Sequence, residues 1–592
     1  MKNINFIKYT AVILSFIPFL IGCEDALDKL PKDRTFPEFF FRTETELELY
    51  TNQFYTYLPS ASAIYGEGSD VLINQTLSEA IRGTREIPGT GGGWSWSQLR
   101  TINECMVGLS NCPDENLKNK YEAITRFFRA YFYFEKVKRF GDVPWYDRPL
   151  GSADADLYKP RDSRELVMTK IIDDLDFAIE HLGQERNLYK ISKWTALAMK
   201  SRVCLFEGTF RKYHGASYPE HDHNYYLQLA ADAADNFITN SGYRLYTSAP
   251  ANAYRDLFSS LNARSEEVIL ARDYNSTLGL FHDANNAMLA LTGGRLSLTK
   301  KIVNSYLMTS GVRFTETPGY ETKSFKDECL NRDPRLAQTI RTPGYTRIGS
   351  NVKLAPNLSV TMTGYQPTKW VMDATYDQVS KSCNDIILFR AAEVYLNFAE
   401  AKAELGTLTQ SDINRSIKPL RDRVSMPNLN LVTVNANPDP YLESAVTGYP
   451  NVDKGPNKGV ILEIRRERTI ELIMEGFRYY DLIRWKEGKA VEQPMHGMYV
   501  SGSGDYDLDN NGMVDVCFYI GTQPPSFAPA FFEIGVNMLL SNGNNGYMDP
   551  HKNTTRTWRE DRDYFYPIPT NDRLLTNGVL TQNPNWNDGL DF

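Results

Sequence analysis

The stretch EIRRERTIELIMEGFRYYDLIRWKEG, residues 463–488, interleaves glutamates with arginines. Three pairs of opposite charge lie three residues apart: Arg468 with Glu471, Glu475 with Arg478, and Arg478 with Asp481. Residues three apart lie on the same face of a helix, so we expect each pair to meet on one helix. Acid catalysis on a glycosidic bond needs two carboxylates that flank a cleft. One helix of alternating charges predicts an ion-pair and packing network instead, with no catalytic residue in it.

Four further segments carry apolar side chains at helical spacing: 121–145, 191–210, 225–238 and 385–406. In the first of them Gly141 and Pro144 are expected to end the helix. In the last, one stripe runs from Ile387 to Leu405, and Gly406 is a plausible stop. Small and large residues alternate in these segments, which lets helices pack closely in pairs. The pattern resembles tetratricopeptide-type hairpins without a fixed repeat period.

The segments divide the chain into two kinds of region. We expect a helical scaffold over about 36–240 and 380–490, with irregular insertions over about 241–380 and 489–560. The insertions are rich in Gly, Pro, Asn and Thr, and loops this long are usually functional or disordered. All of 36–592 is predicted to form one large body, mostly α with minor β.

The N-terminus predicts an exported, lipid-anchored protein. Lys2 and Lys8 precede an apolar run, residues 11–21, that is far too short to span a bilayer. The run ends in LIGC, which resembles a lipobox, so residues 1–22 are expected to be a signal peptide and Cys23 the lipidated residue. Several acyl chains anchor a protein stably where one does not. Residues 23–35 would then be a tether, and its acids resemble the surface-export signal of Bacteroidetes lipoproteins.

Composition and cysteine spacing exclude several other classes. The 592 residues carry a net charge of −8, which argues against a partner held by phosphate neutralisation, so no nucleic acid is expected. The seven cysteines form no CxxC pair and no disulfide framework. Cys105 and Cys112 are expected to be buried free thiols. The common hydrolase and NTPase motifs are also missing from the sequence.

Several motifs together resemble one family. Residues 463–488 carry ERxxEL…EGxRxxDLxRW, which is similar to the signature of the SusD/RagB family. Further matches follow in the expected order: FFRAYFYFEKVKRFGDVPW, RDPRL, LFRAAEVYLNFAEA, YPIP and QNPNW. The resemblance spans nearly the whole chain. It implies a scaffold of four tetratricopeptide-like helix pairs, with a large irregular region that carries the binding site.

The resemblance also implies a function without catalysis. Members of this family are outer-membrane lipoproteins at the cell surface that capture oligosaccharides for a SusC-like TonB-dependent transporter. Some capture peptides instead, and that alternative stays open. A surface glycoside hydrolase and a protein-binding helical adaptor are the remaining alternatives. Oligosaccharide, transporter and membrane are therefore the expected partners.

The expected ligand site centres on GTGGGWSWSQ, residues 89–98. Trp94 and Trp96 follow a run of glycines that favours a surface loop, and flat apolar faces of this kind stack on sugar rings. In the resembling family the stretch before the next helix contributes a stacking tryptophan, which favours Trp96. If the segment is extended, both indoles point the same way and form one platform. The alternative is that one of them plugs the core. Asp70 and Arg82 resemble family positions that line the same pocket.

A second candidate site is the loop DYDLDNNGMVDV, residues 505–516. Its Asp507, Asp509, Asn511 and Asp515 match positions 1, 3, 5 and 9 of a calcium loop. Position 12 is Phe518, so the usual bidentate glutamate is missing. A structural Ca²⁺ is one interpretation and an Asx-rich turn is the other. No further cofactor is expected.

Overall fold

The computed structural model describes residues 40–248, 251–590 and 592. Its first part is helical, with α2 (Glu44–Asn52), α3 (Ala61–Tyr65), α4 (Glu79–Arg82), α5 (Ser97–Gly108), α6 (Glu115–Phe140), α7 (Arg164–His181), α8 (Lys193–His214) and α9 (His223–Asn240). The middle holds the short helices α10 (Ala253–Ser259), α11 (Ala284–Leu289), α12 (Lys300–Ser305), α13 (Phe325–Glu328) and α14 (Arg335–Thr339). The remaining helices are α15 (Ala391–Glu404), α16 (Gln410–Asp422), α17 (Leu431–Ala436), α18 (Pro440–Glu443), α19 (Lys458–Glu471), α20 (Arg478–Arg484) and α21 (Thr570–Leu575).

The longest helix, α6, illustrates how local sequence sets these elements. The carboxylate of Asp114 accepts hydrogen bonds from two backbone N–H groups of the first turn. Such a cap satisfies donors that the helix itself leaves free. The helix ends at Gly141, whose φ of 73° most residues avoid. The predicted stop at this glycine is confirmed.

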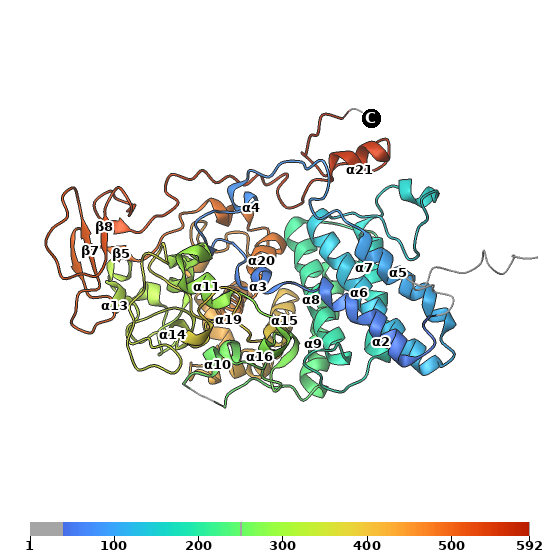
Figure 1. The fold of residues 1–592 in the computed structure, drawn as a ribbon, viewed down its shortest axis with the longest axis horizontal. Coiled ribbons are helices and arrows are strands. Elements are labelled where there is room, and N and C mark those ends of the chain that lie inside the picture. The colour runs from blue at the N-terminus through green and yellow to red at the C-terminus, as the bar shows by residue number, and fades with distance from the viewer. Residues whose placement is uncertain (1–39, 249–250, 591) are drawn as a thin grey trace, which may run out of the picture.

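Paired helices form the scaffold, as expected. Helix α6 packs on α7, α8 on α9, and α15 on α16. Helix α15 also packs on α8 and α9, which joins the two helical parts of the chain into one core. The pairs fill one half of the molecule, and the irregular segments fill the other (Figure 1). The prediction of a mostly helical fold with minor β is confirmed.

The β structure consists of four small sheets among the described residues. Three are antiparallel pairs: β1 (Leu72–Ile73) with β3 (Ser297–Leu298), β2 (Val268–Arg272) with β4 (Ile386–Arg390), and β5 (Tyr499–Val500) with β9 (Gly546–Tyr547). The fourth has the order β6 (Gly504–Tyr506), β7 (Val516–Tyr519) and β8 (Phe531–Glu533), with β6 antiparallel and β8 parallel to β7. It lies at the end of the molecule away from the helix pairs (Figure 1).

One predicted helix is wrong at its start. Residues 385–406 were expected to form one continuous helix, but Ile386–Arg390 is the strand β4, and α15 begins at Ala391. The run of five buried residues pairs with β2, and short apolar runs do not distinguish a strand from a buried helix. The helix ends as predicted, with Gly406 at a φ of 77°.

The predicted ion pairs within residues 463–488 are also wrong in their partners. Helix α19 ends at Glu471 and α20 begins at Arg478, because Met474 and Gly476 between them take positive φ angles of 60° and 78°. The charges therefore pair across elements. Arg468 of α19 bonds Asp481 of α20 at 2.9 Å, and Glu471 bonds Arg390 of β4 at 2.7 Å. The expected network exists, but it joins distant segments.

The C-terminal segment runs back along the molecule from the β end to the helix pairs (Figure 1). On its way the backbone N–H of Tyr566 donates to the carbonyl of Arg139, at the end of α6. The N–H groups of Thr570 and Asn571 then donate to the carbonyls of Pro88 and Gly89. The last part of the chain is thus bonded to the loop that precedes Trp94.

Cysteine chemistry in the described residues agrees with the sequence. Cys105 and Cys112 are both free and buried, so the prediction of unbridged thiols is confirmed. Cys23, the predicted lipidation site, lies outside the described residues. None of the helices in the described part of the chain has the length and apolar character needed to cross a membrane.

Candidate functional site

The glycine loop before Trp94 is held in place by α6. Gly91, Gly92 and Gly93 have φ angles of 78°, 56° and 90°, a backbone that other residues rarely adopt. The ammonium of Lys136 donates to the carbonyls of Gly93 and Ser95. One buried lysine therefore fixes the loop backbone at two positions, and the loop is more ordered than its glycine content suggests.

Arg139, one turn further along α6, fixes the same loop from the other side. Its Nε donates to the carbonyl of Gly92 at 2.9 Å. A Cβ at Gly93 would come within 2.8 Å of that Nε, and the φ of 90° already disfavours any residue with a Cβ, so both features favour glycine here. The guanidinium also lies 3.7 Å from the ring centroid of Tyr566, in the C-terminal segment. The loop is thus clamped between α6 and the end of the chain.

The two tryptophans have different environments. Trp94 is 5% exposed and packs edge-on against Phe140, so it plugs the core beneath the loop. Trp96 is half-buried, and its ring contacts those of Phe132 and Tyr146. The planes of the two indoles meet at 83°. The segment is not extended here, because it turns into α5 directly after Trp96, and the two indoles do not form the single platform expected of an extended segment.

A cavity of about 440 Å³ opens beside Trp96. It lies between the start of α5, the segment after α6, and α21 near the C-terminus. Its aromatic wall is made by Trp96, Tyr146 and Tyr158, with Trp94 behind them, and much of the rest is aliphatic. Cavities of this size, apolar with a few polar groups, are the usual form of small-ligand sites.

Two oxygen acceptors lie in the walls of this cavity. Asn103 of α5 donates both amide hydrogens to backbone carbonyls, those of Tyr146 and Arg148, and its Oδ1 has no hydrogen-bond partner among the described residues. Asp572 of α21 lies half-buried, and no hydrogen bond or ion pair joins its carboxylate to another described residue. Burial raises the pKa of Asp572 above its ordinary value. Asp572 is the acceptor that a donor on a ligand can reach, because the Oδ1 of Asn103 is buried.

Asp70 does not lie in this cavity, contrary to expectation. Its side chain is 1% exposed and is bonded to Arg478 and to Lys301, each at 2.7 Å. Burial alone would raise the pKa of Asp70, but these two positive charges outweigh it and hold the pKa well below its usual range. The geometry assigns Asp70 a structural ion pair between the segment before β1 and α20.

Arg82 also lies outside the cavity. It is the last residue of α4, and its side chain is exposed. Its ligand role stays a prediction. Of the four predicted contacts, the structure brings together Trp94 and Trp96 only.

The residues that sequence reasoning missed are Asn103, Tyr146, Tyr158 and Asp572. Asn103 had a usable signal, since it follows Leu99 by four residues and shares its helix face. Asp572 had no such signal in the sequence, because its position in the cavity wall depends on the path of the C-terminal segment. Two aromatic residues of the irregular middle region, Tyr365 and Trp370, are fully buried in the core and are not available to a ligand.

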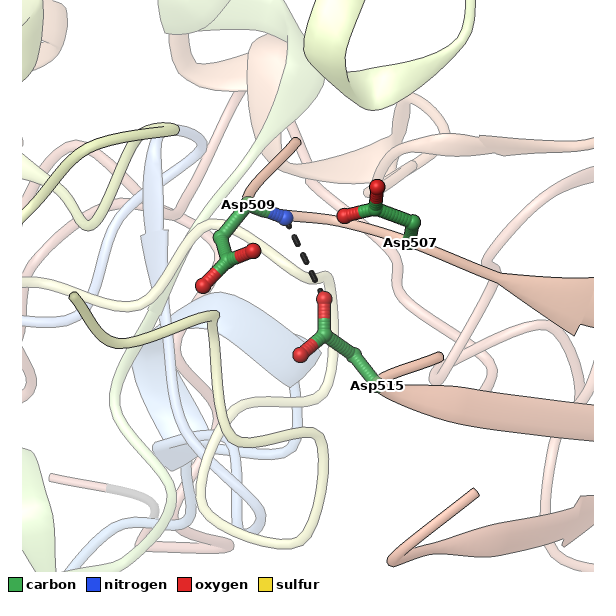
Figure 2. A group of neighbouring side chains, drawn as sticks. All are labelled: Asp507, Asp509 and Asp515. Carbon is green, nitrogen blue, oxygen red and sulfur yellow. Dashed lines mark hydrogen bonds between the residues drawn. The ribbon is translucent and has the colours of Figure 1, made fainter. Parts of the chain in front are cut away.

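The loop at residues 505–516 gathers its acids as a metal site would. One carboxylate oxygen from each of Asp507, Asp509 and Asp515 lies within 4.8 Å of the others. Asp515 accepts hydrogen bonds from the N–H groups of Leu508 and Asp509, and the three side chains face one another (Figure 2). Burial and the neighbouring acids raise the pKa of Asp515. Asn511 bonds Asp509 instead of pointing away from the group.

Phe518 explains why this loop lacks the usual twelfth ligand. It lies on β7 with its side chain fully buried. A glutamate there would point into the core and not toward the three acids. Whether the loop binds Ca²⁺ or is an Asx-rich turn stays a prediction.

Three central glutamates of the signature stretch are each paired with cations. Glu467 bonds Arg335 and Arg421, Glu471 bonds Arg335, Arg390 and Arg423, and Glu475 bonds Lys369 and Arg390. Burial would raise the pKa of Glu471, but the three arginines around it hold the pKa well below its usual value. A carboxylate held ionised in this way has no proton to donate as a general acid.

Comparison with known proteins gives one consistent result. Residues 261–586 match the SusD family, and residues 100–205 match a family described as starch-binding and associating with the outer membrane. SusD-like protein P25 of Formosa agariphila is 22% identical, over 82% of this chain and 90% of that protein. A SusD-like carbohydrate binding protein from Bacteroides fragilis has a similar structure, with a TM-score of 0.66 at 20% identity, over 90% of this chain and 99% of that one. A further structure, described as being with xylogluco-oligosaccharide, gives a TM-score of 0.59 at 18% identity, over 91% and 98% of the two chains.

Proposed function

The chain belongs to the SusD family, and from that premise we propose that it captures oligosaccharides at the outer surface of a cell. It then delivers them to a SusC-like TonB-dependent transporter in the outer membrane. Lipidation at Cys23 keeps it on the membrane, in keeping with a family described as associating with the outer membrane. The protein breaks no bond in this process.

The observation that carries the proposal is the cavity beside Trp96. It combines the half-exposed ring of Trp96 with Tyr146, Tyr158 and the half-buried carboxylate of Asp572. Aromatic faces stack on the C–H faces of sugar rings, and oxygen acceptors take up their hydroxyl groups. Similar SusD-like structures described as carbohydrate binding, or as being with an oligosaccharide, support the same class of ligand.

Two observations on the acidic side chains support ligand binding without hydrolysis. Glu467, Glu471 and Glu475 of the signature stretch are held by arginine and lysine, as described above. In the cavity, Asp572 is an acid without a second carboxylate among the lining residues. Hydrolysis of a glycosidic bond needs a pair.

The test is calorimetric titration of the purified protein with a panel of neutral and charged oligosaccharides. We expect binding by at least one of them, and we expect Trp96→Ala to weaken it about tenfold or more, which is about 1.4 kcal/mol of binding free energy. The matched control is Phe527→Ala, which removes a fully exposed aromatic ring outside the cavity and should leave affinity unchanged.

Two results would contradict the proposal. One is that no oligosaccharide on the panel binds. The other is release of reducing ends from a polysaccharide incubated with the protein, which would indicate the hydrolase alternative.

A further inference from the structure

The walls of the cavity beside Trp96 are more apolar than an unsubstituted sugar requires. Five leucines and two prolines line it together with the aromatic rings. The rim also exposes apolar side chains, since Leu575 is 73% exposed and Tyr158 is 53% exposed. An unsubstituted hexose carries hydroxyl groups around its ring, and burying them against aliphatic walls leaves them without partners. A sugar that fits must carry an apolar substituent.

The polar groups of the cavity restrict that substituent further. Asn103 has both amide hydrogens fixed on the carbonyls of Tyr146 and Arg148. A flip of the amide would place its oxygen against those two carbonyl oxygens, so Asn103 offers the cavity no donor. Asp572, in the first turn of α21, supplies the accessible acceptor. The ligand group must therefore supply a donor next to apolar surface.

The cationic side chains at the rim are already engaged. Arg100 bonds Glu104 and the carbonyl of Leu150, and Arg148 bonds Asp154 and Asp156. Among the described residues that line the cavity, both arginines are therefore already paired, so a carboxylated or sulfated sugar would have to compete with their carboxylate partners. The ammonium groups of Lys159 and Lys136 lie outside the cavity lining, 5.2 Å from the ring centroid of Tyr146 and 5.4 Å from that of Trp96, and their positive charge disfavours a ligand amine. The aliphatic walls add a desolvation cost for any charged substituent, whether a carboxylate, a sulfate or an amine.

One common sugar substituent is neutral, apolar at its end and carries an N–H donor: the acetamido group. On the basis of the proposed glycan-binding function, we propose that this cavity selects oligosaccharides that carry an N-acetylated amino sugar. The acetyl methyl group lies against the leucines, and the amide N–H donates to an acceptor in the wall. Asp572 and Leu575 are the residues of α21 that determine this selectivity.

The experiment compares three trisaccharides with the same β-1,4-linked backbone, which differ only at C2. Chitotriose has an acetamido group there, cellotriose a hydroxyl, and the chitosan trimer an amine. We expect calorimetry to give at least tenfold tighter binding of chitotriose than of either of the others. Asp572→Ala and Leu575→Ser should each weaken chitotriose at least fivefold and leave cellotriose unchanged. Leu574→Ser is the matched control, because Leu574 is exposed on the same helix but does not line the cavity.

Equal or tighter binding of cellotriose, or no binding of chitotriose, would overturn this inference. Tightest binding of the chitosan trimer would overturn it in favour of a cation site at Asp572. Binding of N-acetyl-leucinamide without chitotriose would overturn it in favour of a peptide ligand. If another glycan of the wider panel binds through Trp96, the proposed function stands while the acetamido inference falls. If no oligosaccharide binds, the proposed function itself fails.

Discussion

At the scale of single residues, Trp94 and Trp96 are separated by one residue and have different environments. Trp94 is 5% exposed with its ring against Phe140. Truncation of a buried tryptophan leaves a cavity and costs about 3–5 kcal/mol. We expect Trp94→Ala to lower the free energy of unfolding by that amount, measured by urea denaturation.

The contrast with Trp96 makes that prediction specific. Because Trp96 is only half-buried, Trp96→Ala should lose binding and keep most of its stability. A Trp94→Ala variant as stable as the parent protein would contradict the assignment of Trp94 to the core.

Lys136 gives the site a pH dependence. Burial, with the neighbouring charge of Arg139, lowers the pKa of Lys136 to about 8 from 10.5. The folded chain therefore loses this proton near pH 8, while the unfolded chain keeps it to about pH 10.5, so this group makes folding more favourable as pH rises between the two values.

The local effect on the loop has the opposite sign. A neutral amine is a weaker donor than an ammonium, so its bonds to Gly93 and Ser95 weaken above about pH 8. We expect glycan affinity to fall as pH rises through this value, followed by calorimetry. Lys136→Met should bind more weakly and show no step near pH 8. A step that persists in this variant would show that another group titrates.

At the scale of elements, the loop between β6 and β7 is where metal binding is testable. Asp507, Asp509 and Asp515 face one another across this loop (Figure 2). A ligand that binds only the folded state stabilises it, by about 2.7 kcal/mol at 100 times its Kd. We expect added CaCl₂ to raise the unfolding temperature, and Asp509→Asn to abolish the effect.

The controls for this prediction separate a site from general acidity. MgCl₂ should have a smaller effect, because Mg²⁺ demands stricter geometry. Asp561→Asn alters an exposed acid elsewhere and should leave the calcium effect intact. An unfolding temperature that does not change with calcium would leave an Asx-rich turn as the explanation of the motif.

The elements also show which features of the fold the sequence predicts. Helix α6 was predictable because its apolar spacing, its stop at Gly141 and its length agree. Strand β4 was not, because a fully buried run of five residues has no face that distinguishes helix from strand. The break between α19 and α20 was missed because the positive φ at Met474 has no reliable local signal.

At the scale of the whole molecule, the signature charges connect segments far apart in sequence. Glu471 alone bonds Arg335 of α14, Arg390 of β4 and Arg423 after α16, all of them buried. Removing one partner of a buried ion pair leaves a charge uncompensated and costs about 3–5 kcal/mol. We expect Glu471→Gln to lower the free energy of unfolding by that amount in urea.

The control for Glu471 is an exposed pair. Lys170 and Asp173 meet on the surface of α7, and exposed pairs contribute about 0–1 kcal/mol. Asp173→Asn should therefore change stability little. Equal effects of the two substitutions would mean that the buried network does not hold the fold together.

The candidate site shows the same limit of sequence reasoning. The sequence pointed to the loop with Trp94 and Trp96, because glycines and indoles are adjacent there. It also grouped Asp70 with them, although Asp70 bonds Arg478 of α20. The opposite wall, with Asp572 and Leu575, comes from the end of the chain. Adjacent residues can be recognised together, but a wall supplied by a distant segment requires the three-dimensional path.

Because that wall comes from the end of the chain, a truncated form of the protein would lack it. A chain still being synthesised, or one clipped by a protease before residue 560, would carry both tryptophans and yet have only half a binding site. It would also lack the bonds from Tyr566, Thr570 and Asn571 that close over the loop. The cavity would therefore be complete only after these last residues have packed against the loop. An incompletely synthesised or truncated chain would therefore be unable to bind a ligand in this cavity.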